Sequence, residues 1–285
     1  MGPTPAASVG MVLTGIVSVQ VGGAFAATLF DRVGPAGAVV LRLVFAAAVM
    51  LAWVRPRPRT WSRDDVRVVL GFGVALGVMN LTFYEALDRL PLGAAVTLEV
   101  LGPLTVAVAT GRRWRDGLWA VLAFTGVLVL GGGNLGLDPV GVAFALAAGV
   151  CWGAYILASA ASGRRFAGQQ GLVGAMVVAA VLVCPFGIPQ LAAGSLDASV
   201  LLAGLGIALA SSVIPYSLEL AALRRLPPAV FGVLMSLEPA VAALAGLVVL
   251  GQRLTALGVL AIALVVAASA GASLTGRTTT PVAPD

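Results

Sequence analysis

The stretch Phe231-Gly232-Val233-Leu234-Met235-Ser236-Leu237-Glu238-Pro239 places a carboxylate beside a proline inside a long apolar run. A related block, Leu98-Glu99-Val100-Leu101-Gly102-Pro103, lies in the first half of the chain. Each block follows an Arg-Leu-Pro sequence, and in both the arginine precedes the second proline by 14 residues (103 − 89 and 239 − 225). The two blocks predict two copies of one membrane unit, and they indicate a transporter, because a charge inside a bilayer is rare unless it meets a substrate, an ion or a proton.

The composition places most of the chain in lipid. The 285 residues are 60% hydrophobic and 10% charged, with a mean hydropathy of +1.04, whereas a soluble domain carries about 25% charged residues. The net charge is +5, and all 17 basic residues are arginine. We interpret this balance as charge held on one membrane face, so no nucleic-acid partner is expected. No motif predicts a cofactor or a metal site, and histidine is absent.

Ten apolar stretches are long enough to cross a membrane, which takes about 20 residues per helix. The predicted spans are 9–30, 36–54, 67–87, 91–110, 117–134, 139–160, 170–191, 198–222, 228–250 and 255–274. No secretory signal peptide is apparent, so the first span is expected to remain as a signal anchor. The Thr/Pro-rich tail at 275–285 is predicted to be disordered.

The arginines orient these spans. With the N-terminus inside, thirteen arginines lie in inside loops, three lie in outside loops, and Arg42 lies within the second span. Because basic residues concentrate on the cytoplasmic side, both termini are expected to be cytoplasmic.

Ten spans divide into two sets of five, and five is odd. The second set must therefore enter the membrane in the opposite sense, as in many secondary transporters. We predict an inverted repeat with units at 9–134 and 139–274. Other matches support it, since Gly10 and Gly22 recur 131 positions later in the sixth span.

Four charged residues lie within predicted spans: Arg42, Glu99, Glu219 and Glu238. Each central charge costs roughly 2.5–3.5 kcal/mol on insertion scales. One positive and three negative charges cannot all pair, so at least one carboxylate is expected to be protonated, hydrated or waiting for a cationic group. We expect these side chains to line a central cavity. The alternative is that Arg42 forms a static ion pair with one glutamate and fixes helix packing.

Other polar residues fit the same cavity wall. Ser212, Pro215, Tyr216 and Glu219 share one face of the eighth span, because they follow a three-to-four spacing. Further candidates in other spans are Gln20, Asn80, Tyr84, Trp152 and Tyr155. The alternatives are core packing for Trp152 and Tyr155, and interhelical hydrogen bonds for Gln20 and Asn80.

Three prolines interrupt predicted spans: Pro103, Pro215 and Pro239. Each removes a helical hydrogen bond and can kink or break its helix. Broken transmembrane helices free backbone carbonyls for ligand contact. We therefore predict hinges at these prolines, with a purely structural kink as the alternative.

Together these motifs resemble the EamA family of the drug/metabolite transporter superfamily. The segments that carry the resemblance are Ala38–Leu43, Gly77–Asn80, Leu98–Pro103, Pro215–Glu219, Arg225–Pro227 and Phe231–Pro239. The similarity runs from the first span to the last. It implies a ten-helix fold of two repeats in the bacterial inner membrane, and proton-driven export of small neutral amino acids such as threonine and homoserine. It also implies cavity positions at Arg42, Asn80, Glu99, Tyr216, Glu219 and Glu238, whereas Glu85 departs from the pattern.

The expected mechanism is proton antiport with alternating access. Arg42 would meet the substrate carboxylate, Glu99 or Glu238 its ammonium group, and a second glutamate the proton. Export of other cargo, such as purines, aromatic amino acids or drugs, remains the alternative. An enzyme is not expected, because the chain lacks the histidines of a zinc protease, paired intramembrane aspartates and a Gly-x-Ser-x-Gly elbow.

Overall fold

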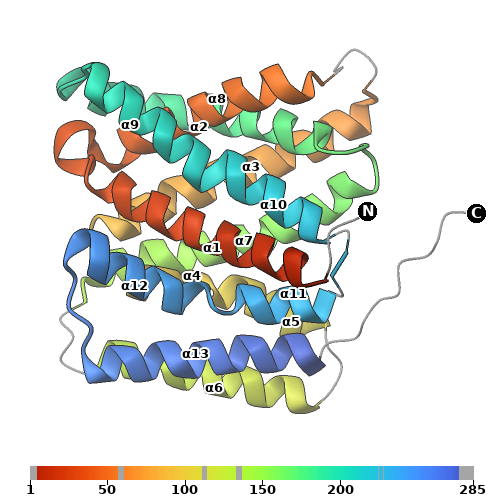
Figure 1. Ribbon diagram of the computed structural model, residues 1–285, viewed down its shortest axis with the longest axis vertical. Coiled ribbons are helices and arrows are strands. Elements are labelled where there is room, and N and C mark those ends of the chain that lie inside the picture. Colours follow the sequence, from red (N-terminus) through yellow and green to blue (C-terminus); the bar gives the residue numbers. More distant parts are fainter. Residues whose placement is uncertain are drawn as a thin grey trace, which may run out of the picture.

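The computed structural model describes residues 5–56, 61–110, 114–132, 137–223, 225–226 and 228–275. All regular secondary structure within these ranges is helical. The helices lie side by side, and the chain reverses direction at two opposite edges of the bundle (Figure 1). The first turn of α1 and the last turn of α13 lie at the same edge (Figure 1).

The first half of the described chain contains α1 (Pro5–Ala27), α2 (Phe30–Val54), α3 (Arg63–Leu87), α4 (Leu92–Glu99), α5 (Leu101–Thr110) and α6 (Trp114–Gly132). The second half contains α7 (Pro139–Gly163), α8 (Gln170–Ala193), α9 (Ala198–Ala208), η2 (Leu209–Val213), α10 (Ile214–Leu223), α11 (Pro228–Met235), α12 (Glu238–Leu250) and α13 (Ala256–Thr275). Eight helical stretches are long and apolar enough to span a membrane, and two shorter apolar stretches match the predicted fourth and fifth spans. The predicted all-α membrane fold is confirmed.

Three predicted spans are interrupted. The fourth divides into α4 and α5, the ninth into α11 and α12, and the eighth contains the π-helical turn η2. Pro103, Pro215 and Pro239 occupy the second or third position of the helix that follows each interruption. A proline is tolerated there, because the first N–H groups of a helix have no intrahelical partner. Glu99 ends α4 and Glu238 begins α12, so each carboxylate lies beside a helix break.

The helix α2 begins at Phe30, six residues before the predicted start of the second span. Gly34 has φ +69° and ψ 163°, and Pro35 follows it inside the helix. Glycine adopts positive φ without the penalty that a Cβ brings, so helical structure continues on both sides of a kink. The side chain of Gln190 in α8 supports the kink, because its Oε1 accepts a 3.1 Å hydrogen bond from the Gly37 N–H.

Helices from the two halves interleave. The helix α2 packs against α8, α3 against α7 and α8, and α6 against α13, while α1 contacts η2, α10 and α12. Small residues permit the closest approaches, as at Gly73 and Gly77 in α3. A Cβ at Gly77 would lie 2.8 Å from Leu182 Cδ2 in α8. These two glycines therefore let α3 pack closely against α8.

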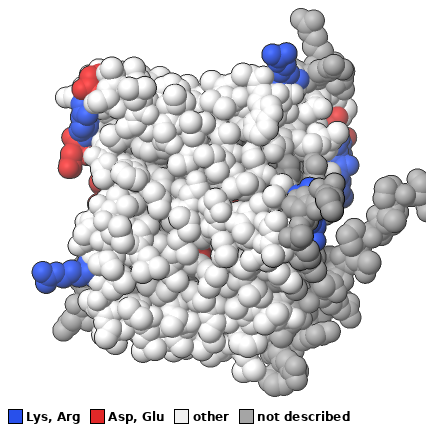
Figure 2. Space-filling model, in the orientation of Figure 1, with Lys and Arg blue, Asp and Glu red and all other residues white. Residues whose placement is uncertain are grey.

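Charge gathers at the two edges where the chain reverses, with an almost uncharged belt between them (Figure 2). The described arginines at the edge of the α1 N-terminus are Arg55, Arg63, Arg67, Arg164, Arg165 and Arg225, and those at the opposite edge are Arg32, Arg89 and Arg253. This excess has the direction that the sequence predicts. Arg57, Arg59, Arg112, Arg113, Arg224, Arg277 and the tail at 276–285 lie outside the described residues.

Candidate functional site

Arg42 lies at the middle of α2 with 6% of its surface exposed. Its Nε donates to Ser212 Oγ at 3.1 Å, its Nη1 to the Tyr84 hydroxyl at 3.3 Å, and its Nη2 to the Ser211 carbonyl oxygen at 2.9 Å. The guanidinium also lies over the Tyr84 ring, 5.6 Å from its centroid. Side chains and backbone from α3 and η2 therefore hold a buried cation on neutral acceptors.

No carboxylate among the described residues lies within 4.0 Å of the Arg42 nitrogens. The alternative expectation, a static ion pair between Arg42 and a glutamate, is therefore wrong for this structure. Glu99 is nevertheless near enough for its charge to interact with that of Arg42. The guanidinium is thus positioned by the protein without being neutralised by it.

The three intramembrane glutamates lie in the same region of the bundle, and Glu99 is the one whose charge interacts with that of Arg42. Glu99 and Glu238 are 9% and 5% exposed, and Glu219 is half-buried. Glu238 is close enough to both other glutamates for their charges to interact with its own. Between described residues, no hydrogen bond or ion pair involves these carboxylates. Nor does the described part of the chain bring three or more potential metal ligands together. The cluster therefore holds an excess of acidic groups over cationic ones.

Aromatic side chains form one wall of the cluster. Tyr216 in α10 is close enough to Arg42 and to all three glutamates to interact with their charges. Tyr155 in α7 lies close to Tyr216 and packs against Phe72 in α3, with ring centroids 5.1 Å apart. Tyr155 thus joins the site more directly than the sequence indicated. The hydroxyls and rings place polar and apolar surface next to each other.

Three other predicted site residues make no described polar contact with the cluster. Asn80 is 2% exposed, but its Nδ2 donates to the Leu76 carbonyl of its own helix at 2.8 Å, so the interhelical hydrogen bond expected for it is not found. Gln20 is 6% exposed, and no hydrogen bond between described residues involves it. Trp152 packs against the hydrophobic core, as its alternative interpretation expects.

Sequence reasoning missed Ser211, because its contact with Arg42 uses the backbone carbonyl. It also missed two glutamines that bond helix N-termini across the bundle. Gln190 accepts from the Gly37 N–H, and Gln252 accepts from the Leu92 N–H at 2.9 Å. For the contact between Arg42 and the Ser211 carbonyl, the one sequence signal is Pro215, which lies four residues after Ser211.

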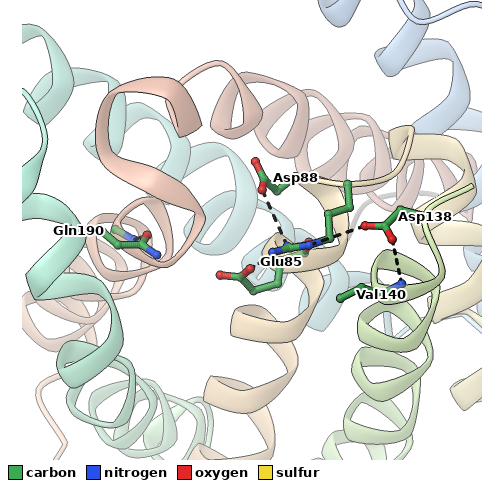
Figure 3. Close-up of polar contacts among 7 residues, drawn as sticks. Glu85, Asp88, Asp138, Val140 and Gln190 are labelled. Atoms are coloured by element: carbon green, nitrogen blue, oxygen red, sulfur yellow. Dashed lines mark hydrogen bonds and ion pairs between the residues drawn. The ribbon is translucent and has the colours of Figure 1, made fainter.

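A second polar cluster lies where the end of α3 meets the start of α7 (Figure 3). Arg89 Nη1 contacts Glu85 Oε2 at 2.8 Å, and the Arg89 guanidinium lies 3.8 Å from a carboxylate oxygen of Asp88 and of Asp138. Asp138 also caps α7 by accepting from the Val140 N–H at 3.0 Å. Glu85 therefore belongs to a network that joins the end of α3 to the start of α7, away from Arg42.

A bundle of apolar helices that encloses one buried guanidinium, two buried carboxylates and one half-buried carboxylate is typical of a multi-pass membrane transporter. Comparison with known proteins agrees with this class. The model of the EamA-like transporter family matches residues 139–274. The threonine/homoserine exporters RhtA of Escherichia coli strain K12 and Salmonella typhimurium strain LT2 are each 39% identical over 270 residues, which cover 94% of this chain and 91% of the relative.

The chain belongs to the EamA-like transporter family, and it is a transporter and not an enzyme. A solved crystal structure shares its fold with a TM-score of 0.65, at 22% identity, over 94% of this chain and 98% of the other.

Proposed function

We propose that this protein exports small neutral amino acids of the threonine and homoserine type from the cytoplasm in exchange for protons. The observation that carries the proposal is a buried guanidinium, held only by neutral acceptors, beside three carboxylates without partners of their own. A zwitterion complements such a site, because its carboxylate meets the cation and its ammonium group meets a glutamate. The relatives named as threonine/homoserine exporters support the same substrate class.

The Arg42 guanidinium has donors to spare for a substrate. Arginine carries five N–H groups, of which three donate to Ser211, Ser212 and Tyr84. One N–H on each of Nη1 and Nη2 remains without a partner among the described residues. Guanidinium groups bind carboxylates strongly through such paired donors. The substrate carboxylate is therefore assigned to Arg42.

The glutamates divide the remaining work. Glu99 shares charge interactions with Arg42, so it is placed to bind the ammonium group of a substrate whose carboxylate is on Arg42. The charged groups that interact with Glu238 are both carboxylates, those of Glu219 and Glu99. Proton binding relieves the repulsion within such a group of carboxylates. Glu238 is therefore assigned the exchanged proton.

Alternating access would use two inverted five-helix repeats, at 9–134 and 139–274, in a drug/metabolite transporter fold. The packing supports this assignment. When each span of the first unit is replaced by its counterpart in the second unit, and the reverse, one observed pair of neighbouring helices becomes another observed pair. The contact of α3 with α7 corresponds to that of α10 with α1, and the contact of α5 with α7 to that of α11 with α1. The family match to 139–274 also coincides with the second unit.

The arginine distribution supports a location in the bacterial cytoplasmic membrane with both termini in the cytoplasm. In this orientation, the edge with Arg89 and Arg253 faces outward. Pro103, Pro215 and Pro239 would serve as hinges beside the interrupted helices.

A flux assay tests the proposal. Purified protein is reconstituted into liposomes loaded with labelled threonine, and release is measured with and without an imposed pH gradient. Release should quicken when protons can move inward against outgoing threonine. Threonine release that is no faster than from protein-free liposomes would contradict the proposed substrate, and release independent of the gradient would contradict proton coupling.

The aromatic wall favours one other cargo. Tyr155, Tyr216 and Phe72 would also accommodate an aromatic amino acid. Competition of labelled threonine with unlabelled homoserine, tryptophan and adenine separates the possibilities, because stronger inhibition by tryptophan than by homoserine would reassign the substrate.

A further inference from the structure

The eighth span changes helical register at its middle. Five residues, Leu209–Val213, form the π-helical turn η2, and the Ile214 N–H bonds the Leu209 carbonyl five residues back. Pro215 follows as the second residue of α10. Residue 215 would bond the Ser211 carbonyl in an α-helical register and the Ala210 carbonyl in a π-helical one. Proline has no N–H, so it can bond neither of them.

Side chains from the other half of the chain bond both carbonyls. Ser18 Oγ in α1 donates to the Ala210 oxygen at 2.7 Å, and Arg42 Nη2 in α2 donates to the Ser211 oxygen at 2.9 Å. The Ala210 and Ser211 carbonyls, one of which an N–H at position 215 would bond, are therefore bonded instead by two contacts that connect η2 to α1 and α2.

The approach of α1 to this turn is unusually close. A Cβ at Gly22 would collide with Ser211 Oγ and lie 3.1 Å from Ala210 Cβ. Ser211 itself is 1% exposed, and its hydroxyl is buried without a hydrogen-bond partner. Ser211 thus packs closely against α1 and contacts Arg42 through its backbone oxygen.

We infer that Pro215 is a positioning residue for substrate recognition, because it releases the Ser211 carbonyl that orients the Arg42 guanidinium toward the substrate carboxylate. The inference rests on the proposed function. Pro215→Ala supplies an N–H that competes with Arg42 for the Ser211 oxygen. The guanidinium then loses one of its three acceptors and rotates, while its charge and the rest of the site remain.

The test measures selectivity as well as rate. Labelled threonine uptake into proteoliposomes is inhibited with unlabelled threonine or with threoninamide, in which an uncharged amide replaces the carboxylate. Wild-type protein should prefer threonine strongly. Pro215→Ala should raise the KM for threonine about tenfold, the lower end for a hydrogen bond to a charged group, with a smaller change in kcat. Its preference for threonine over threoninamide should fall by a similar factor.

Matched variants separate positioning from general damage. Pro185→Ala replaces an exposed proline inside α8 and should leave the KM and the selectivity unchanged. Ser18→Ala removes the bond to the Ala210 carbonyl without altering Pro215, and it should shift selectivity in the same direction. If Pro215→Ala does not fold, the selectivity of Ser18→Ala tests the inference in its place.

Different results would contradict the proposed function and the role of Pro215. Wild-type protein that does not transport threonine, or that accepts threoninamide equally well, would contradict the proposed function. Wild-type selectivity that is lost in Arg42→Gln but kept in both Pro215→Ala and Ser18→Ala would overturn only the inference about Pro215.

Discussion

Gly149 in α7 lies directly against the backbone of Glu99, so that a Cβ at position 149 would be 2.8 Å from the Glu99 carbonyl oxygen. The contact is mutual, because a Cβ at Gly102 would collide with the Gly149 carbonyl. Pro103 cannot donate to the Glu99 carbonyl from within α5. The helix α7 therefore packs against an interrupted helix at the point where a site carboxylate lies.

Enlarging Gly149 should destabilise this contact. Gly149→Val is expected to lower the unfolding free energy by about 1–3 kcal/mol, the usual cost of overpacking, and to lower the unfolding temperature in detergent. Gly206→Ala is the control, because a Cβ at Gly206 meets nothing within 4 Å. That control should be neutral or slightly stabilising, since alanine favours a helix over glycine. Equal effects of both substitutions would contradict the packing argument.

Replacing Arg42 with lysine separates charge from geometry. The lysine side chain would keep the positive charge but lose the planar fork, and with it the bonds to Ser211, Ser212 and Tyr84. Each hydrogen bond to a charged group contributes about 1.5–3 kcal/mol, so kcat/KM for threonine should fall about 100-fold or more in Arg42→Lys. Proteoliposome uptake gives the measurement, and Arg253→Lys, at the edge opposite the α1 N-terminus, gives the control. A variant with nearly wild-type kcat/KM would show that charge alone suffices.

Glu99 and Glu238, which each lie beside a helix break, should give different transport defects when they are replaced. Glu238→Gln cannot exchange a proton, so it should keep threonine counterflow but lose acceleration by a pH gradient. Glu99→Gln should instead raise the KM for threonine, because it removes the partner of the ammonium group. Counterflow and gradient-driven release, measured on the same vesicles, distinguish the two effects. Reversal of the two phenotypes would exchange the assigned roles.

Asp138 has two possible uses, as the cap of α7 and as a partner of Arg89. An asparagine in its place can still accept from the Val140 N–H, whereas an alanine cannot. Asp138→Ala should therefore cost about 1 kcal/mol, as for other N-cap losses, and Asp138→Asn much less. Thermal unfolding in detergent compares them. Equal losses would assign the stability to the ion pair instead of the cap.

The environment of the Asp197 carboxyl predicts that the stability of the protein depends on pH. Hydrogen bonds from Ser199 Oγ, the Val200 N–H and Arg32 hold the pKa of the Asp197 carboxyl well below its usual 3.8. The folded state therefore binds this proton less readily than the unfolded state, and stability rises with pH through that range. The contribution is complete above about pH 4 and is lost as the pH falls toward the folded-state pKa.

The measurement compares the unfolding temperatures of wild-type protein and Asp197→Asn between pH 6 and pH 3. Asparagine keeps the α9 cap, so the variant isolates the charge. The gap between the two proteins should narrow as the pH falls. A gap that stays constant would show that the charge of Asp197 does not contribute.

Hydropathy was sufficient to predict the helical spans, and buried charge to identify Arg42, Glu99 and Glu238 as candidates. The sequence also indicated breaks at Pro103, Pro215 and Pro239, since the loss of an N–H is a local property. It could not reveal the partner of a freed carbonyl, because Arg42 and Ser211 are 169 positions apart and one contributes only backbone. For the same reason it placed Asn80 and Gln20 in a site with which they make no described polar contact.

The bond between Arg42 and Ser211 also sets an order of events during synthesis. Ribosomes add about 5–20 residues per second, so the 169 residues between the two partners take roughly 8–34 s. Once α2 is complete at Val54, its guanidinium has no partner in η2 for the rest of that time. Water, lipid phosphate or the insertion machinery must solvate it meanwhile. Assembly of the charged centre is thus a late step of biogenesis, and a nascent chain that ends before residue 211 holds Arg42 without its two acceptors in η2.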